Sequence, residues 1–227
     1  WHGRPTDFYA DAPFLRPDNS NDAHFYKKSR ITAHIDKQAR DNLKHLLSGL
    51  VHPHTRVLDL RSSVHTHIPN ELYVKELVGL GMNEEELQQN AKLSGHVVHD
   101  INRNPELPFD DGRFDAVICN MSVEYMTQPH ALFEDVARVL RPGGAFVVAF
   151  SNRWFPQKVV RIWSELHEFE RPGLVLDYFL QSGKYEHLHT WSERNWPRVW
   201  DPDDRYLGKV WQSDPLYAVW GRTKKQL

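Results

Sequence analysis

The chain has 227 residues, 40% of them hydrophobic, and a formal net charge of −2, which suits one domain with a modest core. No basic stripe or tail indicates a nucleic-acid partner, the single Cys119 excludes an internal disulfide, and no apolar run reaches the roughly 18–20 residues that span a bilayer. We therefore expect one cytoplasmic domain over residues 1–227, whose oligomeric state the sequence leaves open.

Residues 1–22 are rich in Pro, Asp and Asn and lack periodicity, which predicts an extended arm ending at Asp22 as a helix cap. Apolar residues recur near helical spacing over 23–50 and predict two short helices, or one bent helix, over the mouth of a sheet. On such a helix, three polar residues at i, i+4 and i+8 would share one face: Tyr26, Arg30 and His34.

Five short apolar runs predict strands at 56–60, 74–80, 96–99, 114–119 and 145–150. The first two are separated by about a dozen residues including Pro69, where a helix of two or three turns would still fit. Residues 84–90 are predicted to be helical, with Asn83 as the cap and Glu86 three positions later. A second helix is predicted over 129–140.

The C-terminal third begins with a mostly helical pattern over 156–182 that breaks at Pro172-Gly173. Strands are predicted at 185–191 and 216–221, joined by a loop rich in Pro and Trp. Because strands alternate with helices and two strands close the chain, we predict an α/β fold. Its doubly wound, mainly parallel, seven-stranded Rossmann-like sheet would carry a C-terminal antiparallel hairpin strand. The core would cover 55–221, with a Trp-rich lid over about 151–213.

Four segments occur in the order and spacing of class I S-adenosylmethionine (SAM) dependent methyltransferases, and the chain resembles that superfamily, in particular its type 11-like members. The segments are Val57-Leu58-Asp59-Leu60, Asp100 with Leu107 to Val117, Ala137 to Gly144, and Asp214 to Gly221. Within the superfamily, the chain is similar to a subgroup that replaces the glycine-rich turn after the first strand with an LDLxSS pattern, here Leu58 to Ser63. Two further segments, 25–36 and 79–87, share the resemblance.

The resemblance implies SAM as the cofactor and S-adenosylhomocysteine as its product. Ser62 and Ser63 would offer hydroxyls where the family has glycines, and Arg61 would pair the methionine carboxylate, unless it bridges to a nearby acid. Gly81 stands where the family has an acid that accepts the ribose hydroxyls, so Asn83, or Glu84 from the following turn, would have to substitute. The other cofactor-binding candidates are Asp59, Met82, Asp100, Ile101, Asn120, Met121 and Ser122, together with Tyr26, Arg30 and His34 at the amino-acid end.

Two His-x-His pairs, at 52–54 and 65–67, lack a third ligand with a defined spacing, so we expect no metal site. Candidates for a catalytic base are His34, His65 and Glu124. Trp154 and Tyr125 are predicted to line a substrate pocket, although most of the C-terminal tryptophans are explained equally by core packing.

These observations lead to three hypotheses. The first is a SAM-dependent methyltransferase that acts on a small molecule through an altered cofactor site. The second is a non-catalytic, methyltransferase-like binding protein, motivated by Arg61 and Gly81. The third is an enzyme of the same fold with chemistry other than methyl transfer.

Overall fold

A computed structural model describes residues 9, 12–30 and 33–225, so part of the predicted arm lies outside the described residues. Its core is one seven-stranded sheet with the order β3-β2-β1-β4-β5-β7-β6. The strands are β1 (Arg56–Leu60), β2 (Glu76–Gly81), β3 (Gly95–Val98), β4 (Phe114–Asn120), β5 (Leu140–Ser151), β6 (Tyr185–Glu193) and β7 (Leu216–Thr223).

The sheet is parallel except for β7, which runs antiparallel to both β5 and β6 and lies between them. This confirms the predicted doubly wound α/β fold with a C-terminal hairpin. The strand order reverses between β1 and β4, and in open α/β sheets ligands bind outside the carboxyl ends of the strands at such a point.

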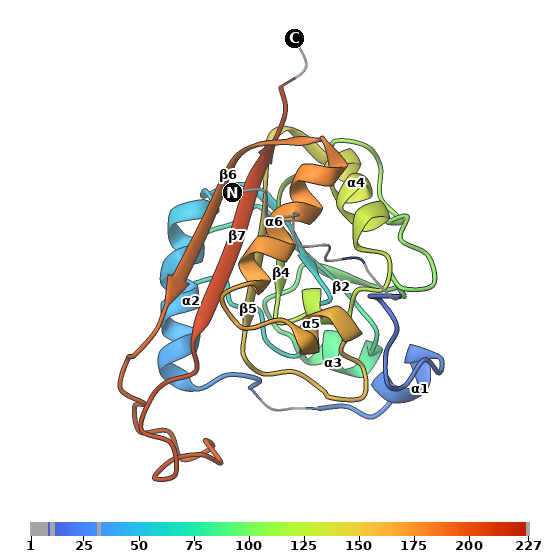
Figure 1. The fold of residues 1–227 in the computed structure, drawn as a ribbon. Coiled ribbons are helices and arrows are strands. Elements are labelled where there is room, and N and C mark those ends of the chain that lie inside the picture. Colours follow the sequence, from blue (N-terminus) through green and yellow to red (C-terminus); the bar gives the residue numbers. More distant parts are fainter. Residues whose placement is uncertain (1–8, 10–11, 31–32, 226–227) are drawn as a thin grey trace, which may run out of the picture.

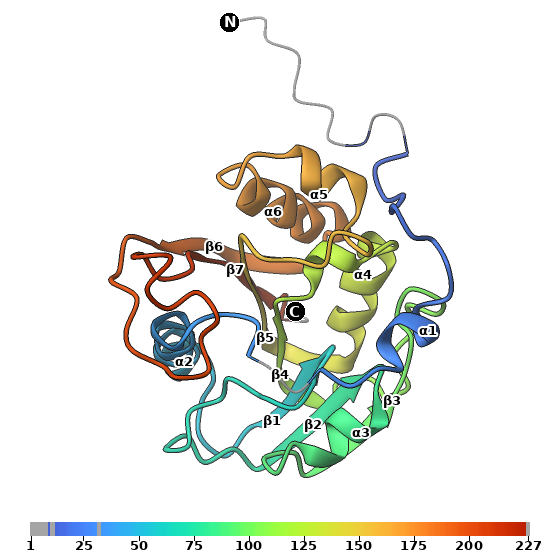
Figure 2. The same cartoon turned by 90° about the horizontal axis from the view of Figure 1, so that it is seen from below.

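Helices cover both faces of the sheet (Figures 1 and 2). On one face, α2 (Lys37–Leu50) buries Ala39, Leu43 and Leu47 against apolar strand residues. On the other face lie α4 (Pro129–Val139) and α6 (Arg171–Ser182), whose Phe133 and Phe179 pack on Phe146 of β5. The short α3 (Glu84–Gln89) places Leu87 over two glycines of β2.

The N-terminal region forms two helices, as predicted, but the boundary differs. Helix α1 (Asp22–Tyr26) has only five residues, so Arg30 and His34 lie beyond it and the predicted common helix face is wrong. The cap is Asn21, which accepts from the Ala23 amide, rather than Asp22. The Asp22 carboxylate is buried instead, where it accepts from Arg16 Nη1 at 2.8 Å.

Two other predicted features are corrected. The connection between β1 and β2 contains no helix; Ile68 fills that place on the sheet as a buried loop residue. Pro172-Gly173 does not break a helix but lies in the first turn of α6, where proline lacks only an amide that would be unpaired anyway. The break falls earlier, between α5 (Arg161–Glu165) and α6.

Strand β5 also starts earlier than predicted, at Leu140, with a register irregularity against β4 that contains the expected Pro-Gly-Gly turn and the positive φ of Gly143. A single 3-10 turn, η1 (Val123–Tyr125), follows β4. Among the described residues, no helix has the length and apolarity needed to cross a membrane.

Candidate functional site

A small pocket lies at the carboxyl ends of β1 and β4, where the strand order reverses. Its cavity volume is about 60 Å³, which holds a few water molecules. Pockets for cofactor-sized ligands are usually about 300–1,000 Å³. The lining residues are Tyr26, Arg30, His34, Arg61, Ser62, Ser63, Met82, Asn83, Glu86, Met121, Ser122, Tyr125 and Phe155.

Most of the residues singled out from the sequence therefore meet at one place. Ten of the predicted cofactor residues line the pocket, as does Tyr125. Reasoning from sequence missed two lining residues, Glu86 and Phe155. Glu86 was visible only as a partner of the Asn83 cap, and Phe155 was hidden beside the more conspicuous Trp154.

Arg61 is the most unusual group in this pocket. Its backbone has a φ of +59°, a left-handed conformation in which non-glycine side chains are strained. The guanidinium lies 5.0 Å from the ring of Tyr26 and 5.7 Å from that of Tyr125. Its Nη1 atom is buried without a hydrogen-bond partner, and Arg61 forms no ion pair with any described acid. The interpretation of Arg61 as one half of a salt bridge is therefore wrong, and its charge remains available to an anionic ligand.

The turn after β1 is held against the end of β2 by Ser62. The Ser62 amide donates to the Leu80 carbonyl at 2.8 Å, and its hydroxyl donates to Asp59 Oδ2 at 2.9 Å. A Cβ atom on Gly81 would lie 2.4 Å from the Ser62 carbonyl oxygen, a distance that no side chain tolerates. The acidic side chain that the family uses for the ribose therefore has no room at this position in this conformation.

Asp59 does not line the pocket but supports the turn after β1 through a hydrogen bond. It is 4% exposed, and burial raises the pKa of its carboxyl to about 7. Because it accepts the Ser62 hydroxyl, its role in the described structure is to orient the turn.

Asn83 does not present its amide to the pocket as a free group. Its Oδ1 accepts from the Glu86 amide as the cap of α3, which confirms the predicted cap. Its Nδ2 donates to the carbonyl oxygens of Tyr26 at 2.8 Å and Lys27 at 3.2 Å. Asn83 thus attaches the end of α1 to the sheet and is a poor substitute for the missing ribose acceptor.

Glu86 joins the same N-terminal segment to the turn after β1. Its two carboxylate oxygens accept from the Arg30 amide and from the Ser63 hydroxyl, each at 2.6 Å. Residues 26–30 therefore form a cover over the pocket, held at its first residues by Asn83 and at Arg30 by Glu86.

Aromatic side chains form another wall of the pocket. Tyr125 and Phe155 stack with ring centroids 5.9 Å apart, and the Tyr125 hydroxyl accepts from the Phe155 amide at 2.9 Å. His34 meets the edge of Phe155 at 5.7 Å. Arg30 lies 5.1 Å from the Phe155 ring, but it donates to the Phe25 carbonyl, so its guanidinium is engaged within the chain.

Four of the predicted cofactor residues besides Asp59 do not line the pocket: Gly81, Asp100, Ile101 and Asn120. Asp100 Oδ1 accepts from the amides of Asn102 and Arg103 and so closes its own turn, while Ile101 is buried in the core. The Asn102 side-chain amide donates to Asp22 of α1 at 2.9 Å, so α1 is docked on the loop that follows β3.

The three candidate bases lie in different surroundings. His34 lines the pocket, whereas His65 is exposed outside it. Glu124 is 1% exposed in η1, between the lining residues Ser122 and Tyr125, and its Oε2 atom is buried without a partner. Burial raises the pKa of Glu124 to about 7.

Trp154 lies outside the pocket, with the Arg171 guanidinium 4.4 Å from its ring. Among the residues that the structure describes, no group of three His, Cys, Asp or Glu side chains has the arrangement of a metal site.

Comparison with known proteins agrees with this fold. Residues 62–148 match the family model described as a methyltransferase domain. The chain is 34% identical over 94 residues to a demethylmenaquinone methyltransferase of Clavibacter sepedonicus, covering 40% of this chain and 37% of that protein. It is 44% identical over 52 residues to the ubiquinone/menaquinone biosynthesis C-methyltransferase UbiE of Chromobacterium violaceum, covering 22% and 21%. The matches thus span well under half the length of these curated relatives.

A solved structure of a methyltransferase from Bacillus halodurans C-125, so far assigned only provisionally to that activity, has the same fold. It superposes with a TM-score of 0.53 at 16% identity, over 83% of this chain and 100% of the other. The matched region begins at Ser62, within the altered turn and after Arg61, and extends into β5, so it contains the carboxyl end of β4. The fold of the chain is thus that of class I SAM-dependent methyltransferases, and its residues 62–148 match a methyltransferase domain.

Proposed function

We propose that the chain is a SAM-dependent methyltransferase that acts on a small molecule through a cofactor site rebuilt around side chains. The observation that carries the proposal is the unpaired, buried Nη1 of Arg61 in a pocket at the switch point of the sheet. A buried guanidinium without a partner is costly, and a ligand carboxylate would remove that cost.

The pocket residues match the amino-acid end of SAM better than its ribose end. At the amino-acid end, Arg61 would hold the carboxylate, and the hydroxyls of Ser63 and Ser122 line the same pocket. At the ribose end, Gly81 has no room for an acid and Asn83 is engaged as a cap. Since the cavity is only about 60 Å³, binding also requires the cover formed by residues 26–30 to move. We therefore infer that the amino-acid end dominates recognition.

The bound cofactor would supply an electrophilic methyl group. The chain would contribute alignment of the acceptor and exclusion of water, with Tyr125 and Phe155 as an apolar wall. For a hydroxyl acceptor, Glu124 is the best candidate to take the proton, because it stands in the chain between the lining residues Ser122 and Tyr125 and its pKa of about 7 suits a general base. The small-molecule class is supported by the names of the two relatives, both of which concern menaquinone.

Calorimetry tests the proposal. SAM and S-adenosylhomocysteine should bind, and Arg61→Met should weaken both by roughly 10- to 100-fold, the loss expected for a charged hydrogen-bonded pair. Methylthioadenosine, which lacks the amino-acid carboxylate, serves as the control ligand and should bind both proteins equally. Absence of SAM binding at millimolar concentration would refute the proposal.

The same geometry supports a second candidate, a binding protein without methyl transfer. It is favoured by the contact between Gly81 and Ser62 and by the small cavity. In that case calorimetry should detect no binding of SAM or S-adenosylhomocysteine. A smaller carboxylate ligand should bind wild type but not Arg61→Met.

A further inference from the structure

The loop between β6 and β7 exposes an unusual amount of aromatic surface. We call residues 194–215 the tryptophan loop. Trp200 is 73% exposed, Trp211 86%, Trp196 45% and Val210 40%. These four residues make up nearly half of the large hydrophobic side chains exposed among the described residues. Scattered exposed apolar residues are ordinary, but a cluster in one loop marks an interaction site.

This exposure does not come from a loosely held segment. Residues 196–198 and 211–213 pair across the loop: the Arg198 amide donates to the Trp211 carbonyl at 2.9 Å, and the Ser213 amide donates to the Trp196 carbonyl at 2.8 Å. Pro197 and Gln212 form a β-bridge between these two hydrogen bonds. The loop therefore has a defined stem.

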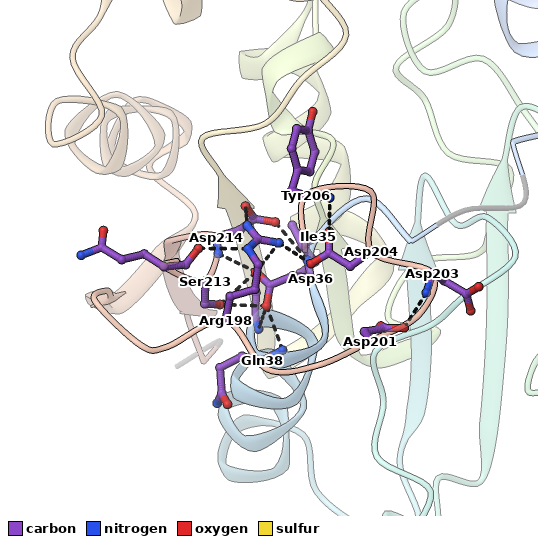
Figure 3. Close-up of polar contacts among 12 residues, drawn as sticks. Ile35, Asp36, Gln38, Arg198, Asp201, Asp203, Asp204, Tyr206, Ser213 and Asp214 are labelled. Atoms are coloured by element: carbon purple, nitrogen blue, oxygen red, sulfur yellow. Dashed lines mark hydrogen bonds and ion pairs between the residues drawn. The ribbon is translucent and has the colours of Figure 1, made fainter. Parts of the chain in front are cut away.

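A buried ion-pair cluster fixes the stem to the domain (Figure 3). The Arg198 side chain is 2% exposed and pairs with Asp204 at 2.6 Å and Asp214 at 2.9 Å. Asp36, the cap of α2, accepts from the Ser213 hydroxyl and from the Asp214 amide. Asp201 is held separately by Arg40 at 2.8 Å. The tryptophans are thus presented on a rigid support, so burying them against a partner costs little conformational entropy.

In the tryptophan loop, most of the acidic side chains are engaged in ion pairs, whereas two basic side chains are exposed and outside any ion pair among the described residues. Asp201, Asp204 and Asp214 are engaged in the ion pairs of its support. Arg205 and Lys209 are exposed and pair with no acid in the described part of the chain, which leaves Asp203 as the one exposed acid of the loop outside an ion pair. The outward surface therefore combines indole rings with a small positive excess, which is the composition that suits the headgroup region of an anionic bilayer.

The position of the loop suits such a surface as well. Because β6 runs parallel to β5, its carboxyl end lies at the same edge of the sheet as the carboxyl ends of β1 and β4. The tryptophan loop projects beyond the body of the domain at this edge (Figure 1). A projecting loop can reach the headgroup region of a bilayer, into which amphipathic segments insert their apolar side by about 5–10 Å.

We propose that the tryptophan loop docks the domain on an anionic membrane surface, with Trp200 and Trp211 in the interface and Arg205 and Lys209 at the headgroups. Docking would turn the edge that carries the pocket toward the bilayer. The inference does not depend on which ligand the pocket binds.

Vesicle flotation tests it with three variants of the whole chain. Wild type should bind vesicles of phosphatidylcholine mixed with phosphatidylglycerol more strongly than vesicles of phosphatidylcholine alone. Replacement of both Trp200 and Trp211 by Ala should lower the partition coefficient at least tenfold, since losing only about 60 Å² of apolar contact has that effect. Replacement of both Arg205 and Lys209 by Ser should remove the preference for the anionic vesicles.

Tyr73→Ala is the matched control, because Tyr73 is 79% exposed but precedes β2 at the amino-terminal edge of the sheet. It should bind vesicles as wild type does. Thermal melting should show all variants to be folded, because each replaced side chain is exposed. Brominated acyl chains should quench the tryptophan fluorescence of wild type more than that of the Trp200 and Trp211 double variant.

Three results would overturn the proposal: no binding of wild type to anionic vesicles, equal binding by the double tryptophan variant, or equal loss in Tyr73→Ala. If wild type ignores vesicles but Trp200 and Trp211 are needed to bind a purified protein, the surface docks a protein and the membrane proposal is wrong.

Discussion

The missing Cβ of Gly81 would lie 2.4 Å from the carbonyl oxygen of Ser62. These two residues belong to neighbouring strand ends, and their contact explains two departures from the family pattern together. The turn after β1 approaches β2 through Ser62, and that approach is possible only because Gly81 has no side chain.

Gly81→Ala should therefore destabilise the protein by about 1–3 kcal/mol or more, because the clash is with backbone rather than with a flexible side chain. Chemical denaturation measures this. Gly95→Ala is the control: it is also a strand glycine, and no atom lies within 4 Å of its missing Cβ. If the two variants are equally stable, the turn is able to move away and the site is less constrained than inferred.

The Glu86 carboxylate should hold the cover over the pocket closed. Glu86→Gln replaces one acceptor by a donor, so either the Arg30 amide or the Ser63 hydroxyl loses its partner. Loss of a charge-assisted hydrogen bond should speed hydrogen exchange at the Arg30 amide roughly tenfold. Glu84→Gln, on the exposed side of the same helix, should leave that rate unchanged; a similar change in both variants would mean that α3 as a whole is affected.

Asp36 should be among the most sensitive polar residues. It caps α2 through the amides of Gln38 and Ala39 and also accepts from Ser213 and Asp214. Asp36→Ala leaves these donors unpaired beside buried Arg198, and we expect a loss of about 3–5 kcal/mol in urea unfolding. Lys37→Ala removes only an exposed ion pair with Asp41 and should cost less than about 1 kcal/mol. Comparable losses would show that the cluster around Arg198 adds little stability.

Asp59 should make stability fall as pH rises. Its folded pKa of about 7 lies above the ordinary value of 3.8, so between these values the folded state binds more protons than the unfolded state. The contribution of Asp59 to the free energy of unfolding is fully present below pH 4. It is lost as pH rises toward 7, by up to about 1.4 kcal/mol per pH unit. Asp59→Asn should therefore be more stable than wild type at pH 8 but not at pH 4. A constant difference across this range would show that burial does not control the ionisation of Asp59.

The sequence alone determined the fold class and most of the pocket. Alternating apolar runs and helical patterns suffice for the sheet, because strand and helix periods depend on local side-chain order. The residues after β1, β2 and β4 were placed at one site because parallel strands end at the same edge. Tyr26, Arg30 and His34 also line this pocket, although the helix expected to align them ends at Tyr26.

Only the tertiary structure decided which of these groups is free to act. Whether Arg61 pairs with an acid, whether Asn83 is engaged as a cap, and whether space exists beside Gly81 all depend on contacts between segments distant in sequence. The same holds for the tryptophans, because Trp163 is buried and Trp211 exposed although each stands between an aliphatic and a polar residue in the sequence. The sequence shows which functional groups a segment carries. Burial and contacts with distant segments decide whether those groups bond within the chain or stay available to a ligand.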